Sequence, residues 1–430
     1  MDRYFEITQH GSTVRTEILA GITTFLTMAY IVFVNPAILA DAGMDRGAVF
    51  VATCLGAAFG TFVMGLYANL PIALAPGMGL NAYFSYGVVL GMHHSWQTAL
   101  GAVFLSGILF IVISVLPVRE AIVNSIPRSL KMAISAGIGF FLAIIGMKNA
   151  GLIKADQNTM VALASLTNLS TVLATVGFVA MVALVKLEVR GAIMIAILGI
   201  SAVGMALGLT PVPATLVSAP PSLAPTFLQL DIAGAMNMGL IAIVFTFLFV
   251  DLFDNAGTMI GVAHRAGLLD ADGKITRLRQ ALLADSTAST VGSLFGTSTV
   301  TSYIESAAGT NAGGRTGLTA VTVGVLFLLA LFFSPLAGSI PAFATAPALI
   351  FVACLMARGM TEIDWEDVTE YGPAVVCALA MPLTFSIAHG IAFGFISYAA
   401  VKLITGRLGE VHPIVGVLAI LFCVKFWWLG

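Results

Sequence analysis

Long apolar runs recur along this chain from residue 17 almost to its C-terminus, and each is near the length that a helix needs to cross a bilayer. That length is about 20 residues. Hydrophobic residues make up 59% of the sequence and charged residues only 9%, whereas a typical soluble domain carries about 25% charged residues. So few charges could not cover the surface of a water-soluble protein. Because lipid offers the backbone no hydrogen-bond partners, we predict an all-α polytopic membrane protein.

The apolar runs divide into fourteen predicted segments, of which three (76–90, 280–294 and 302–313) are short or broken. A further apolar piece, 412–428, is either an additional span or a helix at the membrane interface. The eleven complete spans are predicted at 17–39, 48–69, 98–117, 129–148, 170–188, 191–209, 235–262, 317–335, 338–357, 371–387 and 388–405.

Loop charges predict how these segments are oriented. Segments 118–131 and 263–280 are rich in Lys and Arg, and the linker 210–230 has neither. Basic loops remain in the cytoplasm, so the linker should lie outside and the N-terminus inside. Seven segments then precede the linker and seven follow it with the opposite orientation. We therefore predict a 7+7 inverted repeat of 14 transmembrane segments in the inner (plasma) membrane.

The broken segments occupy matching places in the two halves. LPIALAPGMGLNAYFSYG (70–87) interrupts the third crossing, and FGTSTVTSYIESAAGTNAGG (295–314) interrupts the corresponding crossing of the second half, segment 10. Each reads as a short extended stretch followed by a half-helix. Paired discontinuous helices of this kind indicate a transporter site near the bilayer midplane. The alternative is a pair of re-entrant loops or close helix contacts built from glycine.

A few acids stand inside these apolar segments. Asp251 and Asp254 follow an almost wholly apolar stretch, lie three residues apart and are expected to share a helix face that Thr258 continues. Glu305 begins the half-helix of the second broken segment, where the helix dipole favours an anion. A carboxylate deep in a span costs about 2.5–3.5 kcal/mol, so these acids are expected to be functional.

The chemistry of these side chains suits a neutral, proton-coupled ligand. Ionised carboxylates accept N–H groups, and two close acids raise one another's proton affinity. Asn81, in the first broken segment, both donates and accepts, and so could read the edge of a planar heterocycle. Tyr303 could stack on such a ring. We predict no catalytic residues, no metal site and no cofactor, with H⁺ as the coupling ion.

Other classes of function remain as alternatives. An anion carrier or channel of the same inverted-repeat fold would be expected to offer a cation or a bare helix end rather than three carboxylates. An intramembrane hydrolase could use Asp251 and Asp254 as an acid–base pair, but the chain has no HExxH, GxSxG, P-loop or CxxC motif. The net charge of −2 provides no basic face for nucleic acid.

Four stretches together resemble a known family: TEILAGITTFLTMAYIVFVNP, PGMGLNAYF, VDLFDNAGTMIG and SYIESAAGTNAGGRTGLTA. The chain resembles the azaguanine-type permeases for adenine, guanine and hypoxanthine, in the nucleobase–cation symporter-2 superfamily. The resemblance implies a proton-coupled symporter that imports a purine nucleobase by an elevator-like movement of a core domain against a gate domain. It also implies a homodimer that forms through the gate.

The resemblance implies boundaries and roles as well. The core would comprise residues 1–117 (segments 1–4) and 231–336 (segments 8–11). The gate would comprise 118–230 (segments 5–7 and the exterior linker) and 337–430 (segments 12–14 and the C-terminal apolar piece). Asp254 matches the acid assigned to proton coupling. The residues implied to bind the base are Asp251, Glu305, Asn81, Tyr303 and, with weaker alignment, Thr27.

Overall fold

The computed structural model describes residues 2–115, 126–236, 241–268, 275 and 277–429, and this part of the chain is mainly helical. In the first half the elements are α1 (Asp2–Phe5), α2 (Val14–Met28), α3 (Ile31–Asp41), α4 (Arg46–Val63), η1 (Met64–Ala68), β1 (Leu74–Pro76), α5 (Met78–Ala82), η2 (Tyr83–Gly91), α6 (Trp96–Val115), α8 (Arg128–Asn149), β2 (Ile153–Asp156), β3 (Met160–Leu163), α9 (Leu169–Lys186) and α10 (Ala192–Ala206). In the second half they are α11 (Ile232–Ala235), α12 (Ile241–Ala266), α13 (Leu278–Phe295), β4 (Val300–Ser302), α14 (Ser306–Asn311), α15 (Gly317–Ala330), η3 (Leu331–Phe333), α16 (Ser334–Ser339), α17 (Ala342–Ala357), η4 (Arg358–Glu362), α18 (Val368–Leu383), α19 (Ile387–Ile404), η5 (Leu408–Glu410) and α20 (Pro413–Leu429).

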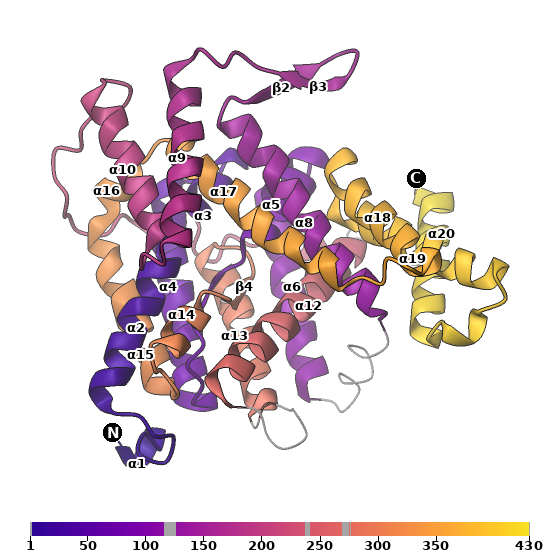
Figure 1. Ribbon diagram of the computed structural model, residues 1–430, viewed down its shortest axis with the longest axis horizontal. Coiled ribbons are helices and arrows are strands. Elements are labelled where there is room, and N and C mark those ends of the chain that lie inside the picture. Colours follow the sequence, from indigo (N-terminus) through magenta and orange to yellow (C-terminus); the bar gives the residue numbers. More distant parts are fainter. Residues whose placement is uncertain (1, 116–125, 237–240, 269–274, 276, 430) are drawn as a thin grey trace.

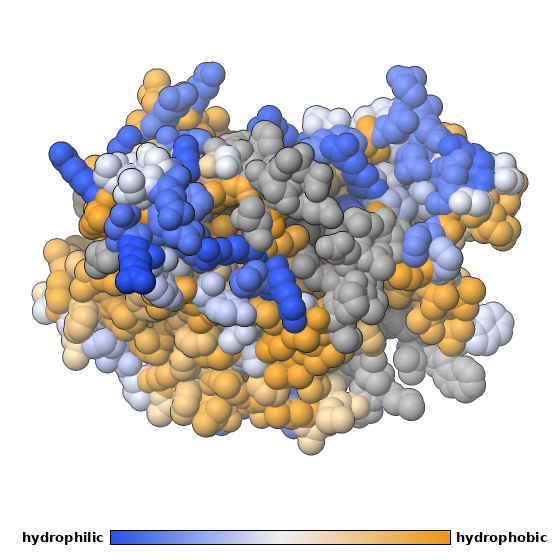
Figure 2. All heavy atoms as spheres, turned by 90° about the horizontal axis from the view of Figure 1, so that it is seen from below, coloured by the Kyte–Doolittle hydropathy of each residue, from blue (hydrophilic) through white to orange (hydrophobic). Residues whose placement is uncertain are grey.

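Eight helices in the described part of the chain are long and apolar enough to cross a membrane, and several shorter apolar helices accompany them. Large apolar side chains on their outer faces are exposed, for example Val176 and Val179 on α9. Figure 2 shows hydrophobic side chains gathered over one broad region of the face in view, with hydrophilic side chains along the opposite rim. The chain is therefore a multi-pass helical membrane protein. Much of segments 118–131 and 263–280, which carry the orientation prediction, lies outside the described residues.

The two broken segments meet at the centre of the helices, where Figure 1 shows β4. Each is an extended strand followed by a short helix, as predicted: β1 leads to α5, and β4 leads to α14. The strands pair antiparallel, with Leu74 opposite Ser302 and Pro76 opposite Val300. This pairing satisfies backbone groups that neither helix could satisfy within the membrane. Two stretches more than 200 residues apart in sequence are thereby held in one register.

The helices pack in two groups. In the first group, α13 packs against α4 and α6, and α15 packs against α2 and α4. In the second, α8 packs against α17 and α18, and α17 also packs against α9. The first group draws its helices from 1–117 and 231–336, and the second draws its helices from 118–230 and 337–430.

Candidate functional site

A cavity of about 530 Å³ lies between the two groups of helices. The broken segments and α12 form one wall, and α8 with the end of α17 and η4 forms the other. The first wall includes Gly77, Met78 and Gly79, Val250, Asp254 and Thr258, and the run from Thr301 to Glu305; the second includes Lys131, Met132, Ile134, Ser135, Ile138, Val352, Leu355, Met356, Gly359 and Glu362. The cavity is thus built around the junction of β1 and β4.

The two acids of α12 differ in whether they meet the cavity. Val250, Asp254 and Thr258 recur at intervals of four and line the cavity. Asp251 is only 1% exposed and is not among the cavity-lining residues. The three residues lie within one broad face of the helix, as their spacing predicts, but only Asp254 and Thr258 meet the cavity. Asp251 lies at the edge of that face and is turned toward α13, where Ser289 and, through Asn255, Asp285 contact it.

Glu305 lies on the cavity wall and is held there by a residue that the sequence did not single out. The hydroxyl of Tyr30, in the turn between α2 and α3, donates to Glu305 Oε1 at 2.6 Å. Tyr30 is fully buried. Thr27, one turn earlier, lies 3.5 Å from the Glu305 carbonyl, but its hydroxyl is closer, at 2.7 Å, to the Thr24 carbonyl. Tyr30 lies in the stretch TEILAGITTFLTMAYIVFVNP, three residues after Thr27. That spacing, about one helical turn from a predicted site residue, was the signal by which the sequence could have indicated Tyr30.

Tyr303 and Asn81 differ in how they meet the cavity. Tyr303 lines it, and its hydroxyl donates to the Pro76 carbonyl at 2.6 Å, which ties the two strands together. Asn81 is fully buried on α5 and is not among the lining residues. Neither its amide nitrogen nor its amide oxygen has a hydrogen-bond partner among the described residues. Asn81 therefore retains two unsatisfied polar atoms one turn beyond cavity-lining Met78 and Gly77.

A cluster of buried polar side chains lies beside Asp251. Asn255 Nδ2 donates to Asp251 Oδ1 at 2.7 Å and to Asp285 Oδ2, on α13, at 2.6 Å. Asn255 Oδ1 accepts from the Ser302 backbone N–H at 2.9 Å. Ser289 Oγ lies 3.2 Å from Asp251 Oδ2. Asp285 was not among the predicted site residues, although it is the one charged residue in the stretch ALLADSTAST (281–290), which was a visible signal.

The cavity also has a cation on its second wall. Lys131 of α8 lines the cavity together with Glu362, and Glu362 is paired with Arg128 at 2.6 Å. The three carboxylates on the wall, Asp254, Glu305 and Glu362, outnumber this one lysine. An arrangement with more acceptors than cations suits a ligand that presents N–H groups better than it suits an anion.

Comparison with known proteins identifies the family. A family model described as "Permease family" (Xan_ur_permease) matches residues 15–393. The chain belongs to this permease family. Relatives of the permease include a permease of Methanocaldococcus jannaschii (54% identity; 100% of this chain, 99% of that one), adenine permease AdeP of Escherichia coli (49%; 99% and 95%) and guanine/hypoxanthine permease PbuO of Bacillus subtilis (45%; 98% and 99%). The relatives are transporters, so the chain is a transporter and not an enzyme.

Solved structures of low identity share the fold of the permease. The transmembrane domain of the cyanobacterial bicarbonate transporter BicA gives a TM-score of 0.65 at 15% identity and covers 88% of this chain and 97% of that one. The murine anion transporter Slc26a9, in the inward-facing state, gives 0.67 at 12% identity and covers 91% and 68%. At such identities the likeness concerns the fold alone.

Proposed function

We propose that the protein is a proton-coupled symporter that imports a purine nucleobase: adenine, guanine or hypoxanthine. The observation that carries this proposal is the cavity of about 530 Å³ with the carboxyl groups of Asp254 and Glu305 in its wall. Small-molecule sites in proteins commonly have volumes of about 300–1,000 Å³. The relatives named as adenine and guanine/hypoxanthine permeases support a purine as the ligand.

The cavity offers what a purine needs. A purine base has ring N–H groups, and adenine and guanine add an exocyclic amino group, so a carboxylate acceptor fits each of them. Tyr30 occupies one oxygen of Glu305, which fixes the carboxylate and leaves its other oxygen for the ligand. Tyr303 lies beside Glu305 and could stack on a flat ring.

The positions of the two α12 acids bear on their roles. The family resemblance implied that Asp251 binds the base and that Asp254 carries the proton. We propose instead that Asp254 and Glu305 contact the base, because both line the cavity, and that Asp251 acts from behind the wall. Asn81, with its unsatisfied amide, and Thr27, beside the Glu305 backbone, remain proposed contributors at the edge of the site.

We also propose how the transporter is organised and moves. The first helix group would be the core, 1–117 with 231–336, and the second the gate, 118–230 with 337–430, in a fourteen-segment inverted repeat. The location of the cavity between the two groups supports an elevator-like movement of one against the other. We expect a homodimer formed through the gate, in the inner membrane, with a cytoplasmic N-terminus that an N-terminal reporter would locate.

The test is uptake by the purified protein in liposomes. Tritiated adenine, guanine and hypoxanthine are supplied outside with an alkaline interior, and a protonophore is the control. We expect accumulation that the protonophore abolishes, and loss of uptake and base binding in Asp254→Asn and Glu305→Gln. Asp364→Asn, at an exposed acid that does not line the cavity, should behave as wild type. If the wild-type protein in these vesicles transports chloride or sulfate but no purine, the anion-carrier alternative is established instead.

A further inference from the structure

Asp251 and Asp285 form a buried pair of acids behind the cavity wall. They are 1% and 0% exposed, and the side-chain amide nitrogen of Asn255 donates to one oxygen of each. Their oxygens are thus no farther apart than two short hydrogen bonds. Two ionised carboxylates so close together in a medium of low polarity would repel strongly. The pair is stable only if it holds at least one proton.

Among the described side chains, none that is positively charged pairs with either acid. Its hydrogen bonds within the described residues come from Asn255, Ser289 and Ser302, all neutral. Of the elements packed around α12 and α13, α5, α6, β1 and β4 contain no ionisable side chain. In the part of the chain that the structure describes, the lysines and arginines on the other elements form no ion pair or hydrogen bond with either acid. The neighbouring elements that do contain ionisable groups are α4 (Arg46 and Cys54), η1 (Tyr67), the residue before α14 (Glu305), α8 (Arg128, Lys131 and Lys148) and α19 (His389, Tyr398 and Lys402). Besides the pair, α12 contributes Asp254 and α13 contributes Arg279. The side chains of His264 and Arg265, also on α12, lie outside the described residues.

The count of hydrogens indicates which oxygen holds the proton. Ser289 Oγ lies 2.8 Å from the Val300 carbonyl, which can only accept, so the single hydroxyl hydrogen is directed there. Asp251 Oδ2 is also in hydrogen-bond range of Ser289 Oγ, at 3.2 Å. With the hydroxyl hydrogen already used, this second contact is favourable if Asp251 Oδ2 carries a hydrogen and donates it to Ser289. A proton on Asp251 Oδ2, donated to Ser289 Oγ, would satisfy both contacts of the serine and agrees with the charge argument.

We propose that the proton coupled to purine transport is carried by the Asp251–Asp285 pair, on Asp251 Oδ2, rather than by Asp254 in the cavity. This inference rests on the proposed symport function and names the proton site for it. It also assigns roles to two side chains that do not line the cavity. Asp285 is the second member of the pair, and Asn255 positions both acids.

Asn255 provides the link between the proton and the base. Its oxygen accepts the N–H of Ser302, and Ser302 is part of the cavity wall beside Tyr303 and Glu305. When Asp251 loses its proton to water, the pair gains a second negative charge. The two carboxylates then attract the amide N–H groups of Asn255 more strongly. A shift of that amide changes the acceptor offered to β4, and through β4 the wall that meets the base. Protonation and base occupancy are thereby coupled through one side chain.

The experiment separates exchange from accumulation in liposomes loaded with the purified protein. Counterflow of tritiated hypoxanthine and adenine requires base binding and movement, whereas accumulation under a pH gradient also requires proton coupling. With one proton coupled, wild type should approach about tenfold accumulation per unit of pH gradient. Asp251→Asn should retain counterflow and lose accumulation, and its counterflow should no longer depend on pH. Asp285→Asn should alter the pH dependence while exchange persists. Asp364→Asn is the matched control.

A spectroscopic measurement covers the case in which a variant is poorly folded. The infrared carbonyl stretch of a protonated carboxyl group should be present in wild type at neutral pH, shift in D₂O, and disappear in Asp251→Asn but not in Asp364→Asn. Ser289→Ala, which removes the acceptor of this proton together with the hydroxyl donor to the Val300 carbonyl, should shift that band without abolishing purine binding.

The outcomes distinguish a wrong proton site from a wrong assignment of proton symport. If wild type accumulates no purine under a pH gradient, proton symport itself is wrong. If wild type accumulates purine and Asp251→Asn does so equally, with unchanged pH dependence, the proton site is elsewhere and symport stands. If folded Asp251→Asn loses purine binding altogether, Asp251 is a base contact and the inference is overturned.

Discussion

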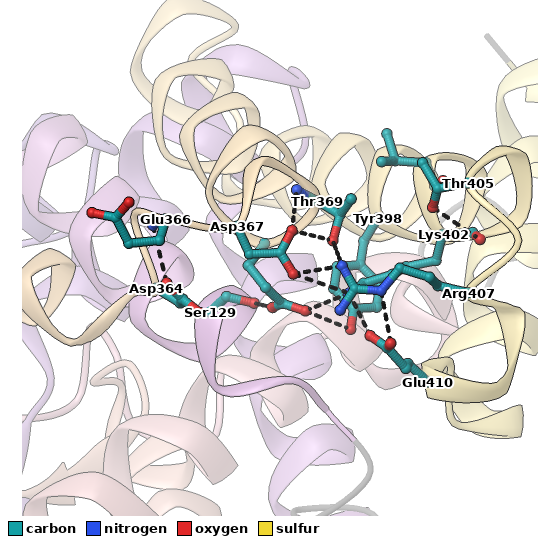
Figure 3. Close-up of polar contacts among 12 residues, drawn as sticks. Ser129, Asp364, Glu366, Asp367, Thr369, Tyr398, Lys402, Thr405, Arg407 and Glu410 are labelled. Atoms are coloured by element: carbon teal, nitrogen blue, oxygen red, sulfur yellow. Dashed lines mark hydrogen bonds and ion pairs between the residues drawn. The ribbon is translucent and has the colours of Figure 1, made fainter.

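Lys402 offers the sharpest test of how the second helix group is held together. Its side chain, near the end of α19, is fully buried, and Nζ lies 2.7 Å from Glu410 Oε2 and 2.8 Å from Glu370 Oε1 (Figure 3). Glu370 also accepts from Tyr398 at 3.2 Å. These contacts join α18, α19 and the turn before α20. Lys402→Met keeps the length of the side chain and removes its charge, so both glutamates lose their buried partner.

The expected cost follows from how buried each partner is. Removing one member of a fully buried ion pair costs about 3–5 kcal/mol, and a hydrogen bond to a charged group contributes about 1.5–3 kcal/mol. The side chains of Glu370 and Glu410 are 21% and 47% exposed, so water can replace part of what they lose. We therefore expect a destabilisation of about 2–3 kcal/mol. At about 2 °C per kcal/mol, this lowers Tm by about 4–6 °C.

The assay is thermal unfolding of the purified protein in detergent, at low and high salt. Arg128→Met is the matched control, because the Arg128–Glu362 pair is just as short, at 2.6 Å, but its side chains are 71% and 48% exposed. Such a surface pair is worth about 0–1 kcal/mol and is screened by salt. A Tm shift in Lys402→Met no larger than that of Arg128→Met would refute the reasoning that burial decides the strength of these contacts.

Three further predictions concern other parts of the chain. Tyr30→Phe frees the cavity glutamate and should weaken purine binding by about tenfold or more, the equivalent of 1.4 kcal/mol, as measured by equilibrium binding; an unchanged Kd would contradict it. Gly317→Ala should lower Tm, since a Cβ there meets the backbone of η1 and overpacking costs about 1–3 kcal/mol, whereas Gly338→Ala faces open space and should not. Arg407, through its hydrogen bond, holds the pKa of Glu410 below its ordinary value of 4.5. That stabilisation is present above pH 4.5 and is lost as the pH falls through the lowered pKa, so Tm should fall on acidification, and less steeply in Arg407→Ala.

The broken segments could be predicted from the sequence, but which of the two α12 acids meets the cavity could not. Prolines and close glycines interrupt the apolar run at 70–87, and such breaks are local properties that composition alone reveals. Whether Asp251 or Asp254 faces the cavity depends instead on how α12 is rotated against its neighbours. A spacing of three makes the two acids neighbours on the helix surface, and only packing decides which of them meets the cavity.

Contacts between distant segments were also beyond the sequence. Asp285 is joined to Asp251 by an amide on α12, 30 residues before it along the chain. Tyr30 reaches Glu305 across 275 residues. Lys131 was assigned to a cytoplasmic loop from its charge, and it lies on the cavity wall because α8 begins at Arg128. The local stretch does not reveal the partner of any of these side chains, because the partner is set by how segments distant in sequence pack together.

The β1–β4 pair explains why the site forms where it does. Strand pairing extends beyond the ladder, with the Gly77 N–H donating to the Thr299 carbonyl at 2.9 Å and the Tyr303 N–H to the Ala73 carbonyl at 3.0 Å. The hydrogen bonds fix both broken segments as one rigid unit, so their cavity-lining residues cannot move apart independently. Any displacement of the first helix group must then carry Asp254, Glu305 and a bound base together past α8 and α17. In the proposed elevator movement the site would move intact, and the proposed proton site, Asp251 with Asp285, belongs to the same helix group and would move with it.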